Sequence, residues 1–233
     1  MEVAAGGVCA YKEQAADDLQ ARAELLVHHH GSVEVAEELL AAALAVDPGH
    51  LDALASMGLL VHAKRRDAAG AEGYLTRALA LDPLHPASLC NLGGICLDDG
   101  RKEYARAEDL FKQCLQVAPD HVMALAFYGL LLQEIKKDYA EAERMMLKAI
   151  RINPVHCDSL SHYATFLGKV HNNYAAATVL YDRVLSLDPL HVNTICNKGL
   201  VLQVPSDVSI YACIHIDIDR ARGRASIDVH THT

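Results

Sequence analysis

Apolar residues recur along this chain at helical spacing, in segments that prolines separate at an almost fixed period. The tetrapeptide "DPLH" occurs at 82–85 and again at 188–191, with near-copies at 47–50, 118–121 and 153–156. The prolines concerned are Pro48, Pro83, Pro119, Pro154 and Pro189, so the steps are 35, 36, 35 and 35 residues. A fixed period of this size indicates a repeat architecture.

Each proline is followed by one apolar helical face. Counted from the His two residues after the proline, positions four, eight and eleven residues on are apolar or small, as in Leu54, Gly58 and Val61. This spacing is one face of an α-helix. The small residue in the middle of the face allows another helix to approach closely.

A second apolar face precedes each proline. Positions twelve, eight and five residues before the proline are apolar, as in Ala36, Leu40 and Ala43 before Pro48. Proline cannot continue a helix interior, and the connections are short enough to join antiparallel neighbours. Each unit is therefore predicted to be an antiparallel helix pair, and the fold class to be all-α.

The repeat resembles the tetratricopeptide repeat family. The matching features are the Leu–x–x–x–Gly of "LASMG", "LCNLG" and "LAFYG", the "YAxA" of "EYARAE", "DYAEAE" and "NYAAAT", and the closing proline. The period of 35 or 36 residues is one or two more than the 34 residues of the usual unit. We place the additional residues between Gly58 and Ala71 and at the equivalent positions, in the turn between paired helices. The resemblance implies a right-handed superhelical solenoid.

The predicted organisation follows from this resemblance. The expected segments are a flexible N-terminus 1–13, a repeat domain 14–203 and a non-repeat tail 204–233. Within the repeat domain we expect units at 14–48, 49–83, 84–119, 120–154 and 155–189, and a half unit at 190–203. The first helix of the first unit matches the pattern poorly, as in many terminal capping repeats.

The remaining face of each first helix lines the concave groove in this family, and it is the predicted binding site. Positions two, five, six and nine after the His point away from the core face. The candidate residues are Asp52, Ser56, Leu59, Asn91, Met123, Phe127, Leu130, Asp158, His162, Asn193 and Asn197. The expected partner is a protein or an extended peptide with an apolar anchor and a neutral or slightly basic character.

The groove positions favour some partners over others. They include no Lys or Arg, so a chaperone C-terminal carboxylate would meet no cation and is an unfavourable partner. Asn91 and Asn197 resemble an asparagine ladder that holds peptide backbone in the O-linked N-acetylglucosamine transferase. The alternative is that both face water. Met123, Phe127 and Leu130 are either an exposed anchor site or covered by a neighbouring helix.

Composition narrows the class of protein. Ala and Leu dominate, and the formal charge of -9 disfavours nucleic acid or an anionic membrane as the main partner. Seven Cys without a framework spacing, and no recognisable secretory signal, predict reduced thiols in a cytoplasmic or nuclear protein. Cys90 and Cys196 are expected to be exposed in the groove.

No cofactor, metal site or enzymatic activity is expected. The sequence contains no phosphate-binding or nucleophile motif. The five periodic His are too far apart to share one zinc ion and are expected to act at helix starts.

The tail changes the pattern. "SIYACIHIDID" alternates as a strand does, so the tail is irregular or a short β-hairpin. The helix of the half unit 190–203 would lack its partner helix, so self-association is expected at the C-terminal end of the repeats. The alternative function is a repeat region detached from a larger enzyme such as a glycosyltransferase.

Overall fold

In the computed structural model, the chain is a succession of α-helices. The structure describes residues 2–28, 32–97 and 101–201, except for the side chains of 2–11 and of His28. These residues contain helices and no strand, so the predicted all-α fold class is confirmed. The predicted tail hairpin lies outside the described residues.

The chain forms two compact units, Met1–Ala124 and Leu125–Thr233. The helices of the first unit are α1 (Glu2–His28), α2 (Val33–Val46), α3 (Leu51–Arg65), α4 (Ala68–Leu81), α5 (Pro86–Leu97) and α6 (Tyr104–Val117). Helix α7 (Val122–Leu131) begins in this unit. The second unit continues with the π-helical turn η1 (Leu132–Lys136), α8 (Tyr139–Ile152), α9 (Cys157–Lys169), α10 (Tyr174–Leu187) and α11 (Val192–Val201).

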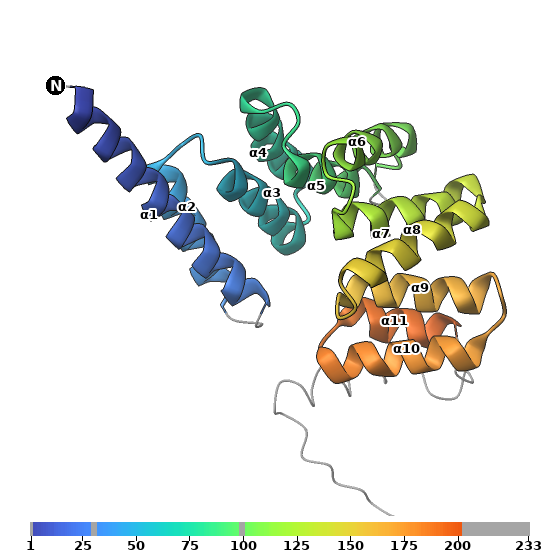
Figure 1. Cartoon of the computed structure of the whole chain (residues 1–233). Helices are drawn as coiled ribbons and strands as arrows, with labels where there is room; N and C mark the ends of the chain where they lie inside the picture. Colours follow the sequence, from blue (N-terminus) through green and yellow to red (C-terminus); the bar gives the residue numbers. More distant parts are fainter. Residues whose placement is uncertain (1, 29–31, 98–100, 202–233) are drawn as a thin grey trace, which may run out of the picture. The chain divides into compact units, whose positions relative to one another are not determined.

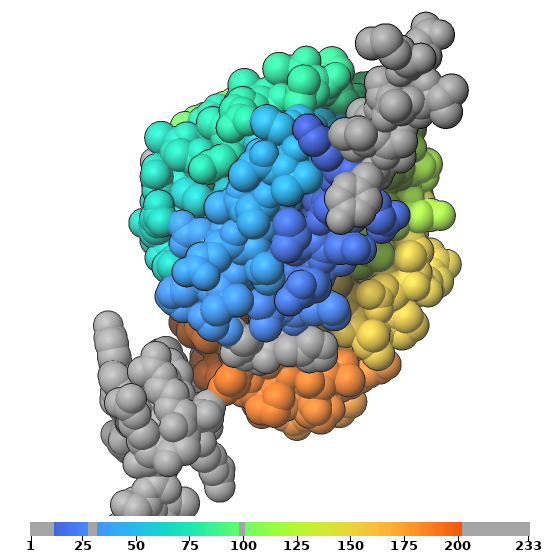
Figure 2. Space-filling view, turned by 90° about the vertical axis from the view of Figure 1, so that its left-hand side faces the viewer, coloured from blue at the N-terminus to red at the C-terminus, as the bar shows by residue number. Residues whose placement is uncertain are grey.

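Consecutive helices pack in pairs, as predicted. In the first unit α1 packs on α2, α3 on α4, and α5 on α6 (Figure 1). The blue and light-blue helices α1 and α2 lie side by side on the surface in Figure 2. In the second unit α9 packs on α10, and Gly129 of α7 faces Met146 of α8. Helix α1 begins at Glu2, inside the segment expected to precede the repeats.

The predicted second-helix face is the core of each pair. The residues twelve, eight and five before the prolines are at most 1% exposed, and they are Ala36, Leu40, Ala43, Ala71, Leu75, Ala78, Ala107, Phe111, Cys114, Ala142, Met146, Ala149, Ala177, Tyr181 and Val184. Each large side chain lies between two small ones, which lets it fill the space left by the glycine or alanine of the first helix.

The "DPxH" motif is a double cap. Asp47 ends α2, and its carboxylate accepts a hydrogen bond from the Gly49 N–H at 2.9 Å. His50 then begins α3, since its ring Nδ1 accepts a hydrogen bond from the Ala53 N–H at 3.1 Å. The side chains of Asp and His thus satisfy backbone donors that the break between the helices leaves without helical partners. The expected helix-start role of His50 is confirmed.

In the four later pairs, the opposite turn, between the two helices of a pair, contains a left-handed residue. These residues are Arg66, Lys102, Lys137 and Asn172, with φ between 53 and 59°. They lie in the turn where the repeat spacing predicts the additional residue. A non-glycine residue in this conformation costs energy, and helix packing on both sides holds it there.

Candidate partner-binding site

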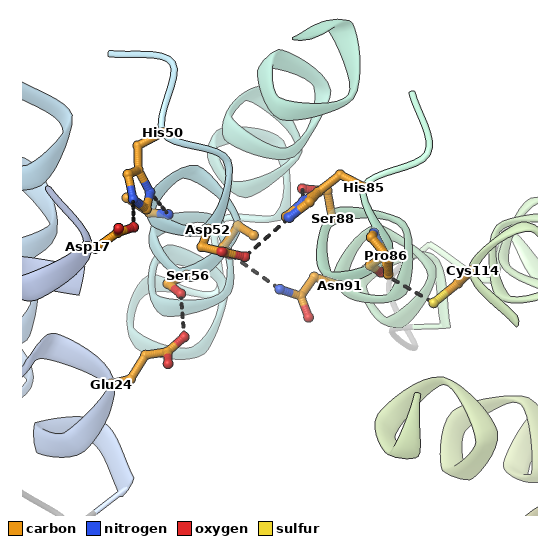
Figure 3. A network of polar contacts seen from close by, with 12 residues as sticks. Asp17, Glu24, His50, Asp52, Ser56, His85, Pro86, Ser88, Asn91 and Cys114 are labelled. Carbon is orange, nitrogen blue, oxygen red and sulfur yellow. Dashed lines mark hydrogen bonds and ion pairs between the residues drawn. The ribbon is translucent and has the colours of Figure 1, made fainter. Parts of the chain in front are cut away.

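A histidine–aspartate ladder joins successive first helices. We use this name for the pairs His50–Asp17, His85–Asp52 and His191–Asp158, in which Nε2 lies 2.8, 3.2 and 3.2 Å from the carboxylate. Figure 3 shows the two pairs of the first unit. Since His50 Nδ1 accepts a backbone N–H, its proton lies on Nε2 and is donated to Asp17.

The ladder keeps Asp52 ionised on the surface of α3. The hydrogen bond from His85 lowers the pKa of Asp52 below its usual value, against the opposing effect of partial burial. Its side chain is 59% exposed, so the carboxylate still faces solvent. One oxygen of Asp52 is fixed by His85, and the other can accept a hydrogen bond from a partner.

A pocket opens between α1, α3 and α5, next to the start of α7. Its volume is about 240 Å³, and its lining residues are Ala23, Glu24, Val27, Leu40, Asp52, Ala55, Ser56, Leu59, Leu60, Ala63, Ala87, Asn91, His121 and Met123. Five of the predicted groove residues, Asp52, Ser56, Leu59, Asn91 and Met123, are among them. The structure therefore brings together the predicted residues of the first unit.

Polar contacts hold the pocket's side chains in place. The Ser56 hydroxyl donates to Glu24 of α1 at 3.0 Å, and the Asn91 amide donates to the Ala55 carbonyl at 3.3 Å (Figure 3). The Asn91 side chain is therefore bonded through its N–H and does not simply face water. Its side-chain oxygen can still accept a hydrogen bond from a partner. The pocket combines apolar walls with a few fixed polar groups, as binding sites do.

Sequence reasoning missed the contribution of α1. Ala23, Glu24 and Val27 line the pocket, although the helix that contains them matches the repeat pattern poorly. The spacing of 33 residues between Asp17 and His50 and of 35 between Asp17 and Asp52 was the available signal. It places Asp17 at the same point of its helix as Asp52.

The expectation that position five of each first helix lines the groove is wrong for Cys90. Cys90 is 0% exposed, and its equivalents Ala55, Ala126 and Ser161 are 2, 1 and 0% exposed. For Ala55 and Ser161 the next first helix accounts for this burial, because α5 packs directly on α3 and α11 on α9. Burial also raises the pKa of the Cys90 thiol well above its usual value, which makes it unreactive. Cys196 is partly exposed.

The predicted residues of the second unit form a more enclosed surface. The Phe127 ring lies 6.0 Å from the ring of His162, which is 9% exposed. Burial lowers the pKa of His162, so the imidazole is neutral at pH 7. Leu130 and Asn197 are partly buried, and Asn193 is exposed. The apolar residues Met123, Phe127 and Leu130 are all partly covered, and none is fully exposed.

Asp158 is the second unit's counterpart of Asp52. Burial alone would raise its pKa, but the hydrogen bond from His191 and the neighbouring His162 bring it down to about 2. The same bond raises the pKa of His191. The Asp158 side chain is 34% exposed, against 59% for Asp52. The hydrogen-bonding capacity of Asp158 is therefore used mainly by residues of its own unit, and less of its carboxylate faces solvent.

The described residues meet neither the requirements of a metal site nor those of a membrane-spanning helix. They contain no group of three or more His, Cys, Asp or Glu that could hold a metal ion. Among the same residues, no helix has the length and apolar character needed to cross a bilayer.

Family comparison agrees with the geometry. Two family models described as tetratricopeptide repeat match the chain, one at residues 29–86 and 60–106 and the other at 124–156. The chain is a tetratricopeptide repeat protein. These repeats support a role as a protein-interaction scaffold. A search of the curated proteins found no match.

Solved structures share the fold at low sequence identity. The thermophilic tetratricopeptide repeat protein TTC0263 of Thermus thermophilus is 16% identical with a TM-score of 0.65, over 82% of this chain and all of the other. A structure from the functional characterisation of Pseudomonas aeruginosa pilF is 21% identical with a TM-score of 0.58, over 92% of this chain and 95% of the other. At these identities the likeness shows the fold alone.

Proposed function

We propose that this chain is a non-enzymatic scaffold that binds an extended partner segment on the face formed by its first helices. The observation that carries the proposal is the pocket of about 240 Å³ between α1, α3 and α5, which contains five of the residues predicted from sequence. The face is built from helices, so its side chains are held by packing and by the ladder rather than by loops.

The binding mode follows from the chemistry of the lining. Apolar side chains such as Val27, Leu59 and Met123 offer an anchor site, and Asn91 offers an amide oxygen to a peptide N–H. An extended segment presents both kinds of group along its length. The other predicted residues, in the second unit, are proposed as further contacts for a longer partner: Phe127, Leu130, Asp158, His162, Asn193 and Asn197.

A peptide selection tests this proposal. A random dodecapeptide display library is selected on the intact chain, and the affinities of the selected peptides are measured by fluorescence anisotropy. The double variant Leu59→Gln with Ala63→Gln makes the pocket wall polar without adding charge. We expect it to weaken binding at least tenfold, because the anchor loses its apolar surroundings.

A matched control separates the pocket from the rest of the surface. Leu81→Gln with Ala80→Gln makes the same two changes on α4, where Leu81 is 61% exposed and neither residue lines the pocket. We expect this variant to bind within about twofold of the wild type, since a surface site away from the pocket contributes little. Equal loss in both variants, or no selected peptide at all, would contradict the proposed function.

A further inference from the structure

We infer that the pocket of the first unit recognises one large apolar side chain together with a neighbouring Lys or Arg of the partner segment, and that Glu24 and Asp52 bind the cation. This inference rests on the proposed function and specifies the partner. It follows from the size of the pocket, from the small residues that line it, and from its two carboxylates, each of which has one oxygen without a hydrogen bond.

The pocket has the size of a single side chain. A cavity of about 150 Å³ is enough to hold benzene, and this pocket has about 240 Å³. Drug-sized ligands occupy sites of roughly 300–1,000 Å³. The volume therefore fits one aromatic or long aliphatic side chain rather than a whole cofactor or several anchors.

Small residues create this space. Alanine occupies positions 23, 55, 63 and 87 of the lining. Ala87 is informative because the equivalent positions of three other first helices are Asp17, Asp52 and Asp158, the acidic members of the ladder. An Asp at 87 would place a third carboxylate in the lining. With alanine, this part of the pocket is apolar and open.

Two carboxylates border the apolar space, and each is only half used. Glu24 accepts from Ser56 through one oxygen, and Asp52 accepts from His85 through one oxygen. Within the part of the chain that the structure describes, neither residue has any other hydrogen bond or ion pair. The lining contains no Lys or Arg. Two negative charges beside one pocket, without a Lys or Arg in its lining, favour a cationic ligand group.

The same arrangement disfavours acidic partners. A peptide carboxylate at this site would meet Glu24 and Asp52 without a compensating charge, while the fixed oxygens of both residues match the donors of a guanidinium or ammonium group. Since Asn91 provides an acceptor for backbone beside the pocket, the partner segment needs only an apolar residue with a basic residue within a few positions.

The peptides from the dodecapeptide selection are the probes for this inference. We expect each strong binder to contain a large apolar residue with Lys or Arg within three positions. Changing that basic residue to Glu is expected to weaken binding at least tenfold, and changing the apolar residue to Ala about thirtyfold. Raising the salt concentration should weaken the basic peptides selectively.

Variants of the protein identify the partners of the cation. Glu24→Gln and Asp52→Asn keep the shapes of the side chains and remove their charges. We expect each to weaken binding about threefold and the double variant about tenfold, as for partly exposed ion pairs. The double variant should also bind the peptide whose basic residue is changed to Glu with the same affinity as it binds the original peptide. Asp109→Asn, on the exposed part of α6, is the charge control and should have no effect.

A filled pocket tests the anchor. Ala87→Met places a large side chain in the lining and should abolish binding, whereas Ala105→Met, on an exposed surface of α6, should not. Circular dichroism and thermal unfolding of each variant check that the helices are intact.

The outcomes distinguish this inference from the proposed function. If Leu59→Gln with Ala63→Gln weakens binding at least tenfold while Glu24→Gln with Asp52→Asn leaves it unchanged, the face binds peptides but the cation assignment is wrong. Selected peptides without a basic residue would overturn it equally. If the pocket variants leave all binding unchanged, the proposed function itself is wrong.

Discussion

The first and second units use the same helix pair but present different surfaces. Two residues after the helix-starting His, the first unit has Asp52 and the second has Asp158, and both accept a hydrogen bond from a ladder His. Six residues after the His, the first unit has Ser56 and the second has His162. The caps and the core are shared, while the surface differs.

The difference lies in the volume of the non-core residues. In the first unit, Ala23, Ala55, Ala63 and Ala87 leave a pocket beside half-used carboxylates. In the second unit, the rings of Phe127 and His162 lie against each other, and Asp158 is held by His191. A repeat scaffold can therefore keep its packing constant and change its binding surface one residue at a time.

The largest change in the free energy of unfolding should come from substitution of the glycines at the centres of the helix pairs. A Cβ on Gly93 would lie 2.6 Å from the fully buried Phe111 ring, and one on Gly129 would lie 2.9 Å from Met146 Cγ. Gly93→Ala should lower the free energy of unfolding by about 2 kcal/mol, because the aromatic ring cannot move aside. Gly129→Ala should lower it by less, about 1 kcal/mol, because Met146 Cγ and the Ala142 carbonyl at 3.2 Å must shift, but the unbranched methionine adapts more easily than the ring.

Urea unfolding followed by circular dichroism measures both changes. Equal destabilisation by the two substitutions would show that the flexibility of the facing side chain does not decide the outcome.

Acid should affect Asp158 more than Asp52. Because the folded pKa of Asp158 is about 2 and its ordinary value is 3.8, its contribution to stability is present above pH 4 and is lost as the pH falls toward 2. We expect a loss of about 1 kcal/mol, allowing for screening of its partly exposed side chain. Thermal unfolding between pH 5 and pH 2 should show a smaller dependence for Asp158→Asn than for Asp52→Asn. The reverse order would contradict the difference in burial.

The ring contact of the second unit can be removed separately. Phe127→Ala should lower the free energy of unfolding by about 1 kcal/mol, from lost contact with the His162 ring and lost apolar burial. It should also move the pKa of His162 back toward 6.5, because the imidazole becomes more accessible to water. An NMR titration of the His162 ring protons measures this shift. An unchanged titration would mean that Phe127 does not shield His162.

The smallest effect should be the same in both units. Arg66 and Lys137 have φ of 53° and 59°, where glycine is favoured. Arg66→Gly and Lys137→Gly should each stabilise their unit by about 0.5 kcal/mol, the relief of strain being partly offset by the flexibility of glycine when unfolded. Lys136→Gly, before the left-handed residue, is the control and should destabilise. A loss of stability in Arg66→Gly or Lys137→Gly would show that the turn holds no strain.

Much of the fold could be predicted because the repeat displays its core five times. The apolar positions before Pro48 return before each later proline, and all of them are buried. The site could be predicted only in part. The offsets predict Asp52, Ser56 and Leu59, but Glu24 lies on a helix without the motif, and Cys90 is buried although its offset predicts exposure.

The sequence by itself determined the helix pairs, their caps and the residues that fill each pair, since these depend on spacing within one period. The tertiary structure alone decided which surface positions are open, because exposure depends on the side chains of the next helix, more than thirty residues away. It is the packing of α1, α3 and α5 that leaves a pocket with two half-used carboxylates, and Phe127 against His162 that encloses the corresponding position of the second unit.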